Sequence, residues 1–335
     1  MIPSDRRAAL VGPLFVLGYC VINSLKSVLE GSLVQSLSPE FIVVNSFALA
    51  QAFYLLTLPD KRGLLADVRR CLSDVVMLNI STAVCWLAFL YAFTVLEPAV
   101  VNALINGLVP AITILLGFRL RPGVKALPLE IAAAAGMLAA MGFLLLAAFR
   151  GSSAIGEISG GALVFGVVVC VFASTSLSGI TYYTKRLGEA GMTVRQILAT
   201  RFVLLLVSTP VLLVAREGYE TYTPRNVLAI LAISLVGVIV SIYLLQQGIM
   251  RTEPITVSML FGTNLLITYI AQFLDPRLHQ SGETLVGVLV LSAAMCLGTW
   301  GRWRAGAAGP AAPATTPPPP TEPLPERDAP ARTDP

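Results

Sequence analysis

Ten long apolar stretches dominate this chain, and they restrict its fold more than any other feature. Each is close to the ~20 residues that a helix needs to cross a bilayer. The stretches cover residues 9–28, 40–58, 75–95, 98–118, 127–149, 161–183, 194–215, 227–250, 254–274 and 284–303. They are continuous, whereas the strands of a membrane barrel alternate apolar and polar residues. The sequence therefore predicts an all-α membrane protein with ten transmembrane helices.

The composition excludes the main soluble classes. Hydrophobic residues make up 56% of the chain and charged residues 13%, about half of the roughly 25% charged residues in a typical soluble domain. A soluble enzyme, a nucleic-acid-binding protein or a disordered scaffold would need more polar surface. No Ser/His/Asp set or glycine-rich phosphate loop is present, and a single histidine with scattered cysteines does not favour a metal site. We therefore expect a lipid bilayer as the main environment, with no enzyme activity, cofactor or nucleic-acid partner.

Lys and Arg are unevenly shared between the two sets of connecting segments. If the N-terminus is inside, the cytoplasmic segments before the tail carry fifteen of these residues and the opposite segments carry four. Positively charged loops remain in the cytoplasm, so both termini and the loops at 59–74 and 119–126 are predicted to be cytoplasmic. Residues 1–8 form a short N-terminal segment, and residues 304–335 form a Pro/Ala-rich tail that we expect to be disordered.

Two Glu-Pro pairs, Glu97-Pro98 and Glu253-Pro254, each lie between two apolar stretches and are 156 residues apart. Proline has no N–H to leave unsatisfied in the first turn of a helix, and glutamate is favoured at the positive end of the helix dipole. Each pair therefore predicts a tight helical hairpin, between spans 3 and 4 and between spans 8 and 9. Direct contact of either glutamate with a substrate is the alternative role.

Further matches at nearly the same offset indicate an internal repeat. Phe47 and Phe202 begin similar apolar runs 155 residues apart, and Glu130 and Glu283 precede the last span of each half at an offset of 153. The two halves are residues 9–149 and 161–303. Because each half has five spans, the second half would enter the membrane from the opposite side. Such an inverted repeat is typical of secondary transporters.

The chain resembles the drug/metabolite transporter superfamily, specifically its EamA-type family. The similarity lies in the ten spans in two halves, the "LEP" and "TEP" hairpins, the lysine in "INSLKSVLE" and the segment "ATRFVLL". The family's usual arginine early in the second span of each half is present as Arg201, whereas the first half has Ser46. The resemblance implies a central cavity lined by spans 1–4 and 6–9, with spans 5 and 10 at the periphery.

The implied function is secondary transport by alternating access. The substrate would be a small polar metabolite, either neutral, zwitterionic or anionic, and the direction would be export. No carboxylate lies deep in a predicted span, which argues against organic cations and carboxylate-based proton antiport. A short N-terminus without a targeting extension favours a bacterial inner membrane. The alternatives are a nucleotide-sugar or sugar-phosphate exchanger, and a non-transporting membrane interaction protein that uses its proline-rich tail.

Polar side chains inside apolar spans are costly, so they are the candidate cavity residues. They are Asn23, Lys26, Asn45, Asn79, Trp86, Asn102, Asn106, Tyr182, Arg201, Gln246, Gln247 and Asn264. For the amides, hydrogen bonding between helices is the alternative to substrate contact. For Lys26 the alternative is snorkelling to the interface while paired with Glu30. For Arg201 it is pairing with backbone carbonyls or another polar side chain.

Two backbone features of the spans suggest further roles. Gly107 and Pro110 lie within one turn of span 4, which predicts a kink and a gating hinge there. The matching part of span 9 has Gly262 but no proline, so span 4 is expected to bend more.

Span 5 carries a stripe of small residues, Ala132, Gly136 and Ala140, that suits close helix contact. Its partner is either another helix of the same chain or a second copy, in a homodimer through spans 5 and 10.

Overall fold

All regular elements in the described part of the chain are helices. The computed structural model describes residues 4–120, 126–150, 159–215, 222–275 and 282–304. Ten segments are long and apolar enough to cross a membrane: Leu10–Leu33, Pro39–Leu56, Leu72–Phe93, Pro98–Leu120, Pro128–Ala147, Gly160–Glu189, Val194–Ala215, Pro224–Arg251, Pro254–Leu274 and Gly282–Gly301. The predicted ten-span all-α architecture is confirmed, and every span begins within three residues of its predicted start. The predicted tail lies outside the described residues.

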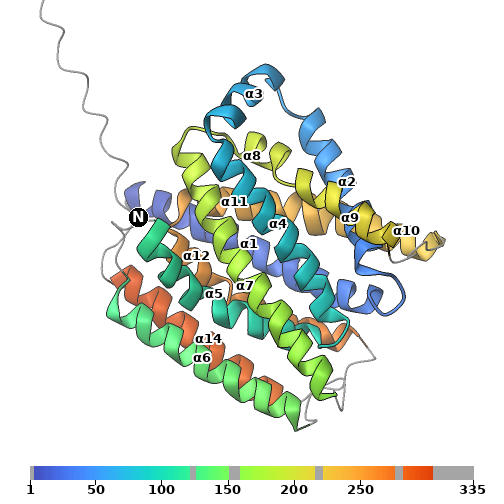
Figure 1. Cartoon of the computed structure of the whole chain (residues 1–335). Helices are drawn as coiled ribbons and strands as arrows, with labels where there is room; N and C mark the ends of the chain where they lie inside the picture. Colours follow the sequence, from blue (N-terminus) through green and yellow to red (C-terminus); the bar gives the residue numbers. More distant parts are fainter. Residues whose placement is uncertain (1–3, 121–125, 151–158, 216–221, 276–281, 305–335) are drawn as a thin grey trace, which may run out of the picture.

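The first six spans are single helices, whereas spans 7, 8 and 9 are irregular (Figure 1). The single helices are α1 (Ser4–Leu33), α2 (Pro39–Leu56), α4 (Leu72–Phe93), α5 (Pro98–Leu120), α6 (Pro128–Phe149) and α7 (Gly160–Glu189). Span 7 comprises α8 (Val194–Thr200) and α9 (Val203–Ala215). Span 8 comprises α10 (Pro224–Ala232), the π-helix η1 (Ile233–Val240) and α11 (Ser241–Arg251). Span 9 comprises α12 (Pro254–Leu260), α13 (Thr263–Ala271) and the 3-10 turn η2 (Gln272–Leu274). Span 10 is α14 (Gly282–Arg304), and a short helix, α3 (Lys61–Arg70), connects spans 2 and 3.

Proline begins five of these helices, because its fixed φ suits the first turn and its missing N–H costs nothing there. The five are α2, α5, α6, α10 and α12. Pro98 and Pro254 are among these first residues, and Glu253 is the N-cap of α12. Both Glu-Pro pairs therefore lie at the hairpin turns that the sequence predicts.

Helices from different halves of the chain form the most extensive pairs. α1 packs along α11, α4 along α7, and α6 along α14. The pair α6 and α14 runs side by side along one edge of the bundle (Figure 1). A Cβ atom at Gly136 of α6 would lie 3.5 Å from Ala294 Cβ of α14. Gly136 of the small-residue stripe thus faces the same chain, while the homodimer stays a prediction.

Three connections and the start of span 1 meet at one end of the bundle. Gln196 Nε2 donates a hydrogen bond of 2.7 Å to Asp67 Oδ2. This bond joins the connection between spans 2 and 3 (the 2/3 connection) to the connection between spans 6 and 7 (the 6/7 connection). Lys185 Nζ donates to the Met250 carbonyl at 3.1 Å, which brings in the 8/9 connection. Gly12 in α1 lies against the same 8/9 turn. This is the end that the Lys and Arg distribution predicts to be cytoplasmic.

The remaining described connections meet at the opposite end. Gln35 Nε2 donates to the Phe93 carbonyl at 3.2 Å, which joins the 1/2 and 3/4 connections. Tyr222, just before span 8, donates through its hydroxyl to Asn45 Oδ1 at 2.9 Å. Successive connections therefore alternate between the two ends, as they must in a multi-pass protein. The side of the membrane that each end faces stays a prediction.

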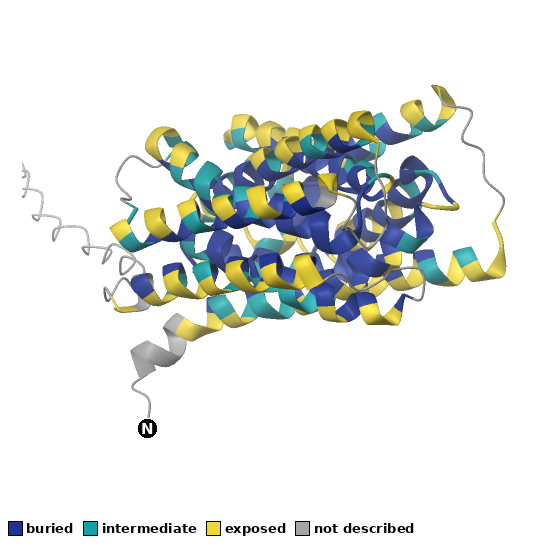
Figure 2. Ribbon diagram, turned by 90° about the horizontal axis from the view of Figure 1, so that it is seen from below, coloured by how far each residue is buried: buried dark blue, intermediate teal, exposed yellow. Residues whose placement is uncertain are grey.

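The outward faces of the helices are apolar and exposed (Figure 2). On α9, Val203, Val207, Val211 and Val214 are each more than half exposed and follow one face of the helix. A soluble protein rarely exposes a continuous apolar face of this kind. In a bilayer the same face contacts lipid tails, so the exposed surface fits a membrane protein.

The natural cysteines allow a test of the orientation. Cys71 lies between α3 and α4 at the arginine-rich end, whereas Cys20, Cys85 and Cys170 are buried and Cys296 is on a membrane-spanning helix. We expect a membrane-impermeant maleimide to label Cys71 only after intact cells are permeabilised. A Ser36→Cys variant in a Cys71→Ala background is the matched control, because Ser36 is exposed at the opposite end. Rapid labelling of Cys71 in intact cells would contradict the orientation.

Candidate functional site

A group of three charged side chains is buried in the middle of the helix bundle. Lys26 of α1 is 4% exposed, Glu30 of the same helix 1%, and Arg201 of span 7 also 1%. We refer to these three residues as the central charge cluster. Buried charges are tolerated only when they are paired or hydrogen-bonded. The contacts of each member therefore decide what the cluster can do.

Lys26 pairs with Glu30 one helical turn later. Its Nζ lies 3.2 Å from Glu30 Oε2, and 4.0 Å from the ring centroid of Trp86 in α4. Gly237 of η1 lies so close to the lysine stem that an added Cβ would be 2.6 Å from Lys26 Cδ. The expected partner of Lys26 is present, but the snorkelling alternative is wrong. Trp86 and η1 cover the side chain, and α1 continues past the predicted end of span 1 to Leu33.

Glu30 is the carboxylate of the cluster. The sequence predicts that acidic residues lie in loops, in the tail or at the ends of spans, and Glu30 lies in the last turn of the span Leu10–Leu33. Its side chain is nevertheless almost fully buried, and Lys26 is its ion-pair partner.

Arg201 has neutral partners. Its Nε donates to Thr82 Oγ1 at 3.2 Å, and its Nη1 donates to Gln246 Oε1 at 3.4 Å. Among the described residues, no carboxylate forms an ion pair with this guanidinium. The alternative in which Arg201 contacts other polar side chains therefore matches the structure. With Lys26 and Glu30 cancelling each other, the charge cluster carries one net positive charge.

The side-chain amide of Asn79 stabilises the break in span 7 at which Arg201 lies. In a regular helix, the Leu204 N–H would donate to the Thr200 carbonyl. Here Asn79 of α4 satisfies both groups: its Oδ1 accepts from Leu204 N at 3.2 Å, and its Nδ2 donates to Thr200 O at 2.8 Å. Gln51 of α2 donates to the Ala199 carbonyl at 2.5 Å. Two amides from other helices thus stabilise the break.

Aromatic side chains connect Arg201 with Lys26. The Phe47 ring lies 5.0 Å from Trp86 and 5.2 Å from Phe202, measured between centroids. Thr82, which binds Arg201, and Trp86, which contacts Lys26, are four residues apart and share one face of α4. The two cations therefore contact successive turns of the same helix.

Asn102, Asn106 and Tyr182, like Asn79, donate to backbone carbonyls. Asn102 Nδ2 donates to the Pro98 carbonyl at 2.9 Å, and Asn106 Nδ2 to the Asn102 carbonyl at 2.8 Å, both within α5. The two side chains share a face, as predicted. The Tyr182 hydroxyl donates to the Thr113 carbonyl at 2.8 Å and so joins α7 to α5. The bond of Tyr182 joins two helices, whereas those of Asn102 and Asn106 stay within one helix and are not the bonds between helices that the alternative expects.

The other predicted amides are spread along the bundle. Asn264 of α13 accepts from Ser24 Oγ of α1 at 3.3 Å. Asn45 contacts Tyr222 at the end of the bundle opposite the arginine-rich loops. Asn23 is 3% exposed, and its Oδ1 has no donor among the described residues. The structure thus brings Trp86 and Gln246 to the charge cluster and leaves Asn45 away from it.

The irregular backbone lies in span 9 rather than span 4. α5 continues through Pro110 without interruption, whereas span 9 is interrupted at Phe261 and Gly262. An added Cβ at Gly262 would lie 2.7 Å from Met295 Sδ of α14, so a close approach requires glycine there. Gly107 makes only ordinary contacts, the nearest 3.6 Å from Leu291. The greater bending of span 4 and the gating role of Gly107 and Pro110 stay predictions.

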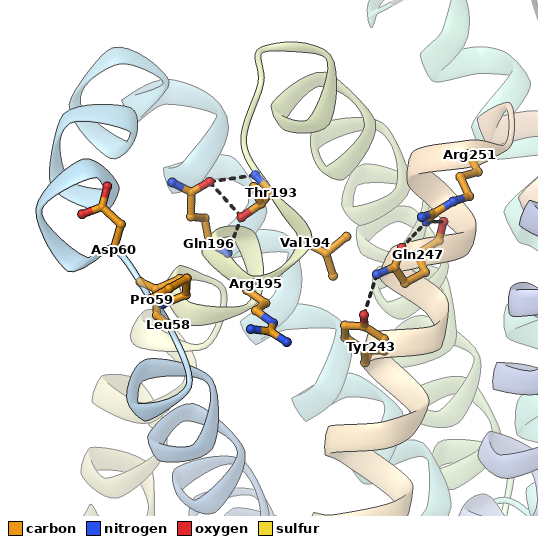
Figure 3. Close-up of a pocket in the computed structure, with 10 residues that line it drawn as sticks. All are labelled: Leu58, Pro59, Asp60, Thr193, Val194, Arg195, Gln196, Tyr243, Gln247 and Arg251. Carbon is orange, nitrogen blue, oxygen red and sulfur yellow. Dashed lines mark hydrogen bonds between the residues drawn. The ribbon is translucent and has the colours of Figure 1, made fainter.

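An open pocket of about 420 Å³ lies at the arginine-rich end of the bundle (Figure 3). Three segments line it: the end of span 2, the start of α8 and the end of α11. Its lining residues are Leu58, Pro59, Asp60, Thr193, Val194, Arg195, Gln196, Tyr243, Gln247 and Arg251. Gln247, predicted as a cavity residue, faces this pocket and donates to the Tyr243 hydroxyl at 2.8 Å. The preceding residue, Gln246, accepts the hydrogen bond of Arg201.

Comparison with known proteins supports the fold but names no activity. No known family profile matches the chain, and no curated protein matches it. Nineteen solved chains resemble its structure. One, described only as "Crystal structure of protein", has a TM-score of 0.65 and 15% identity, and the match covers 90% of this chain and 99% of the other. At this identity the similarity concerns the fold alone.

Sequence reasoning missed Gln51, Thr82 and the two phenylalanines at this site. Gln51 is a polar residue within an apolar span, and the criterion that selected the other amides would have found it. Thr82 precedes Trp86 by four residues, which was a usable spacing signal. The contact between Phe47 and Phe202 had no local signal, because it joins residues from two halves of the chain.

The side-chain amide of Asn79 leads to a stability prediction. Replacing Asn79 with leucine is expected to lower the free energy of unfolding by about 1–3 kcal/mol, because it leaves the Thr200 carbonyl and the Leu204 N–H unsatisfied. Asn102→Leu is the matched control with a smaller expected loss, because the Pro98 carbonyl keeps its helical partner. Thermal unfolding in detergent measures both. Equal losses would show that the break does not depend on Asn79.

Proposed function

We propose that this protein is a secondary transporter of the drug/metabolite transporter superfamily that moves a small polar metabolite across the cell membrane by alternating access. The observation that carries the proposal is the charge cluster, buried where helices of both halves meet. Charged groups inside a membrane bundle are costly, so they typically mark the path of a substrate or an ion. The resemblance noted in the sequence favours export from a bacterial cell.

Pairs of equivalent contacts support an inverted repeat. Gly12 of α1 lies against the second Glu-Pro hairpin, and Gly166 of α7, 154 residues later, lies against the first. An added Cβ at Gly166 would be 2.6 Å from Leu96 Cδ1. Phe47 and Phe202, which the repeat makes equivalent, contact each other. A helix of each half thus packs against the Glu-Pro hairpin of the other half, as expected for two related units.

The helix breaks at the site suit alternating access. Transporters typically bind substrate where membrane helices are discontinuous, because freed backbone groups and helix ends are polar there. Span 7 is broken at Arg201, and span 8 becomes π-helical beside Lys26. Irregular segments of this kind can change conformation without unfolding a whole helix.

A metabolite profile tests the proposal. Polar metabolites are measured in cells and in medium, with and without the protein, and the expected result is that a few of them shift to the medium. An Arg201→Gln variant produced at the same level should lose the shift. A variant lacking residues 305–335 should keep it, which separates transport from recruitment by the tail. Unchanged metabolites, together with proteoliposomes that retain a loaded cell extract, would contradict transport.

A further inference from the structure

The charges of the central charge cluster do not cancel. Lys26 and Glu30 pair with each other, whereas the described partners of Arg201 are neutral. Arg201 is only 1% exposed, and an uncompensated buried guanidinium is strongly unfavourable. A costly buried charge of this kind typically has a functional role, such as binding an ion or a substrate. The simplest complement is one group with a single negative charge.

Two N–H donors on side chains that contact the charge cluster also lack acceptors: Gln246 contacts Arg201, and Trp86 contacts Lys26. Gln246 Nε2 and Trp86 Nε1 are buried and have no hydrogen-bond partner among the described residues. Gln246 already accepts from Arg201 through its other amide atom, and Trp86 follows Thr82 by one turn of α4. Because nearly all buried donors in proteins are satisfied, this region is suited to added acceptor oxygens. A carboxylate supplies two such oxygens together with the negative charge, and its planar geometry matches a guanidinium.

Neutral acceptors are present as well. Gln51 Oε1 and Asn23 Oδ1 are buried without a donor among the described residues. An amide oxygen can accept from a hydroxyl or an ammonium group, but it does not neutralise a full positive charge. The net charge of the cluster therefore favours a ligand with one net negative charge over a zwitterion.

The surroundings of the cluster are aromatic. Phe47, Trp86 and Phe202 pack against one another between Lys26 and Arg201. Rings of this kind favour contact with an apolar or aromatic group. The ligand that fits these neighbours has a carboxylate at one end and an apolar body at the other.

The end pocket supplies an approach for such an anion. Figure 3 shows Arg195, Gln247 and Arg251 at its lining, with Asp60 as the one acid among the lining residues. Two exposed arginines raise the local concentration of anions at an opening. Gln247 of the pocket lining is the residue after Gln246, which is the partner of Arg201.

We propose that Arg201, Gln246 and Trp86 bind the carboxylate of a monoanionic organic solute with an apolar body, which reaches them through the end pocket. The proposal rests on the transport function and names its substrate class. The carboxylate would accept from the guanidinium, from Gln246 Nε2 and from Trp86 Nε1. The apolar body would replace part of the contact among the aromatic rings.

Binding by the purified wild-type protein tests the proposal without any mutation. Calorimetry in lipid nanodiscs compares 3-phenylpropionate with its neutral amide, 3-phenylpropanamide, and with zwitterionic phenylalanine. The carboxylate is expected to bind on the order of tenfold to a hundredfold more tightly than the amide, because charge-assisted hydrogen bonds are lost in the amide. Equal binding of the amide, tighter binding of phenylalanine, or displacement by chloride with no preference for the carboxylate would overturn the proposal.

Variants then locate the binding site. Arg201→Gln should weaken binding of 3-phenylpropionate by the same factor, and Arg201→Lys should bind at an intermediate level because it keeps the charge and loses the planar fork. Arg186→Gln is the matched control, since Arg186 pairs with Asp74 at the bundle end and should bind normally. Unchanged binding by a folded Arg201→Gln variant would overturn the assignment. If that variant does not fold, Gln246→Leu provides the same test, with weaker binding expected.

The two proposals can fail separately. Binding of 3-phenylpropionate without its transport into proteoliposomes would support the site and contradict the transport function. Export of a neutral metabolite without anion binding would support transport and contradict the site.

Discussion

Replacing Glu30 with glutamine is expected to destabilise the folded protein by about 3–5 kcal/mol, the typical cost of removing one partner of a buried ion pair. Lys26 would keep its charge in a position that is 4% exposed. Among the described residues, no other carboxylate lies within ion-pair distance of its ammonium. The aromatic face of Trp86, 4.0 Å away, compensates only in part.

A double-mutant cycle separates the ion pair from the packing of the two side chains. Lys26→Met and Glu30→Gln are each expected to be strongly destabilising, and the double variant is expected to recover most of the loss, because it removes both charges of the pair. Chemical unfolding in detergent measures the four proteins. Asp74→Asn is the matched control: it breaks the Arg186–Asp74 pair, whose arginine side chain is 41% exposed, and should cost less than about 1 kcal/mol. Equal effects of Glu30→Gln and Asp74→Asn would mean that Lys26 reaches water.

The spans could be predicted from the sequence because the bilayer imposes one length and one composition on every crossing. The same rule does not predict where a helix breaks. Residues 197–205 are apolar apart from Thr200 and Arg201, and by themselves they favour one continuous helix. The break at Arg201 depends on Asn79 and Gln51, which lie in other helices. Contacts of this kind have no local signal.

Burial of the charge cluster was unpredictable for a similar reason. The spacing of Lys26 and Glu30 predicts that they pair, since residues four apart share a helix face. The spacing does not say whether this face points to lipid, to water or to another helix. That answer comes from Trp86 and Gly237, which cover the lysine from α4 and η1. The candidate residues were therefore found from the sequence, whereas their grouping around Arg201 required the structure.

Replacing Gly166 with leucine is the second change with a large expected effect. An added Cβ at this position would lie 2.6 Å from Leu96 Cδ1 and 3.2 Å from Val95 Cγ2, at the hairpin between spans 3 and 4. Larger side chains forced into a packed interface typically cost about 1–3 kcal/mol. Gly142 of α6 is the matched control, because an added Cβ there meets no atom within 4 Å. Gly142→Leu should leave the unfolding temperature unchanged or raise it, because leucine favours a helix more than glycine does.

The equivalent position in the first half makes this test specific to the proposed repeat. Gly12 lies against Thr252 at the other Glu-Pro hairpin, and an added Cβ would lie 3.0 Å from Arg251 Cβ. If the two hairpin contacts are equivalent, Gly12→Leu and Gly166→Leu should lower the unfolding temperature by similar amounts. Both should also slow transport more than they weaken binding, because the hairpins lie where the two halves contact each other and must rearrange between conformations. A loss confined to Gly166→Leu would show that the two hairpin contacts are not equivalent. Similar unfolding temperatures of Gly166→Leu and Gly142→Leu would show that packing of Gly166 against the hairpin does not stabilise the contact between the halves.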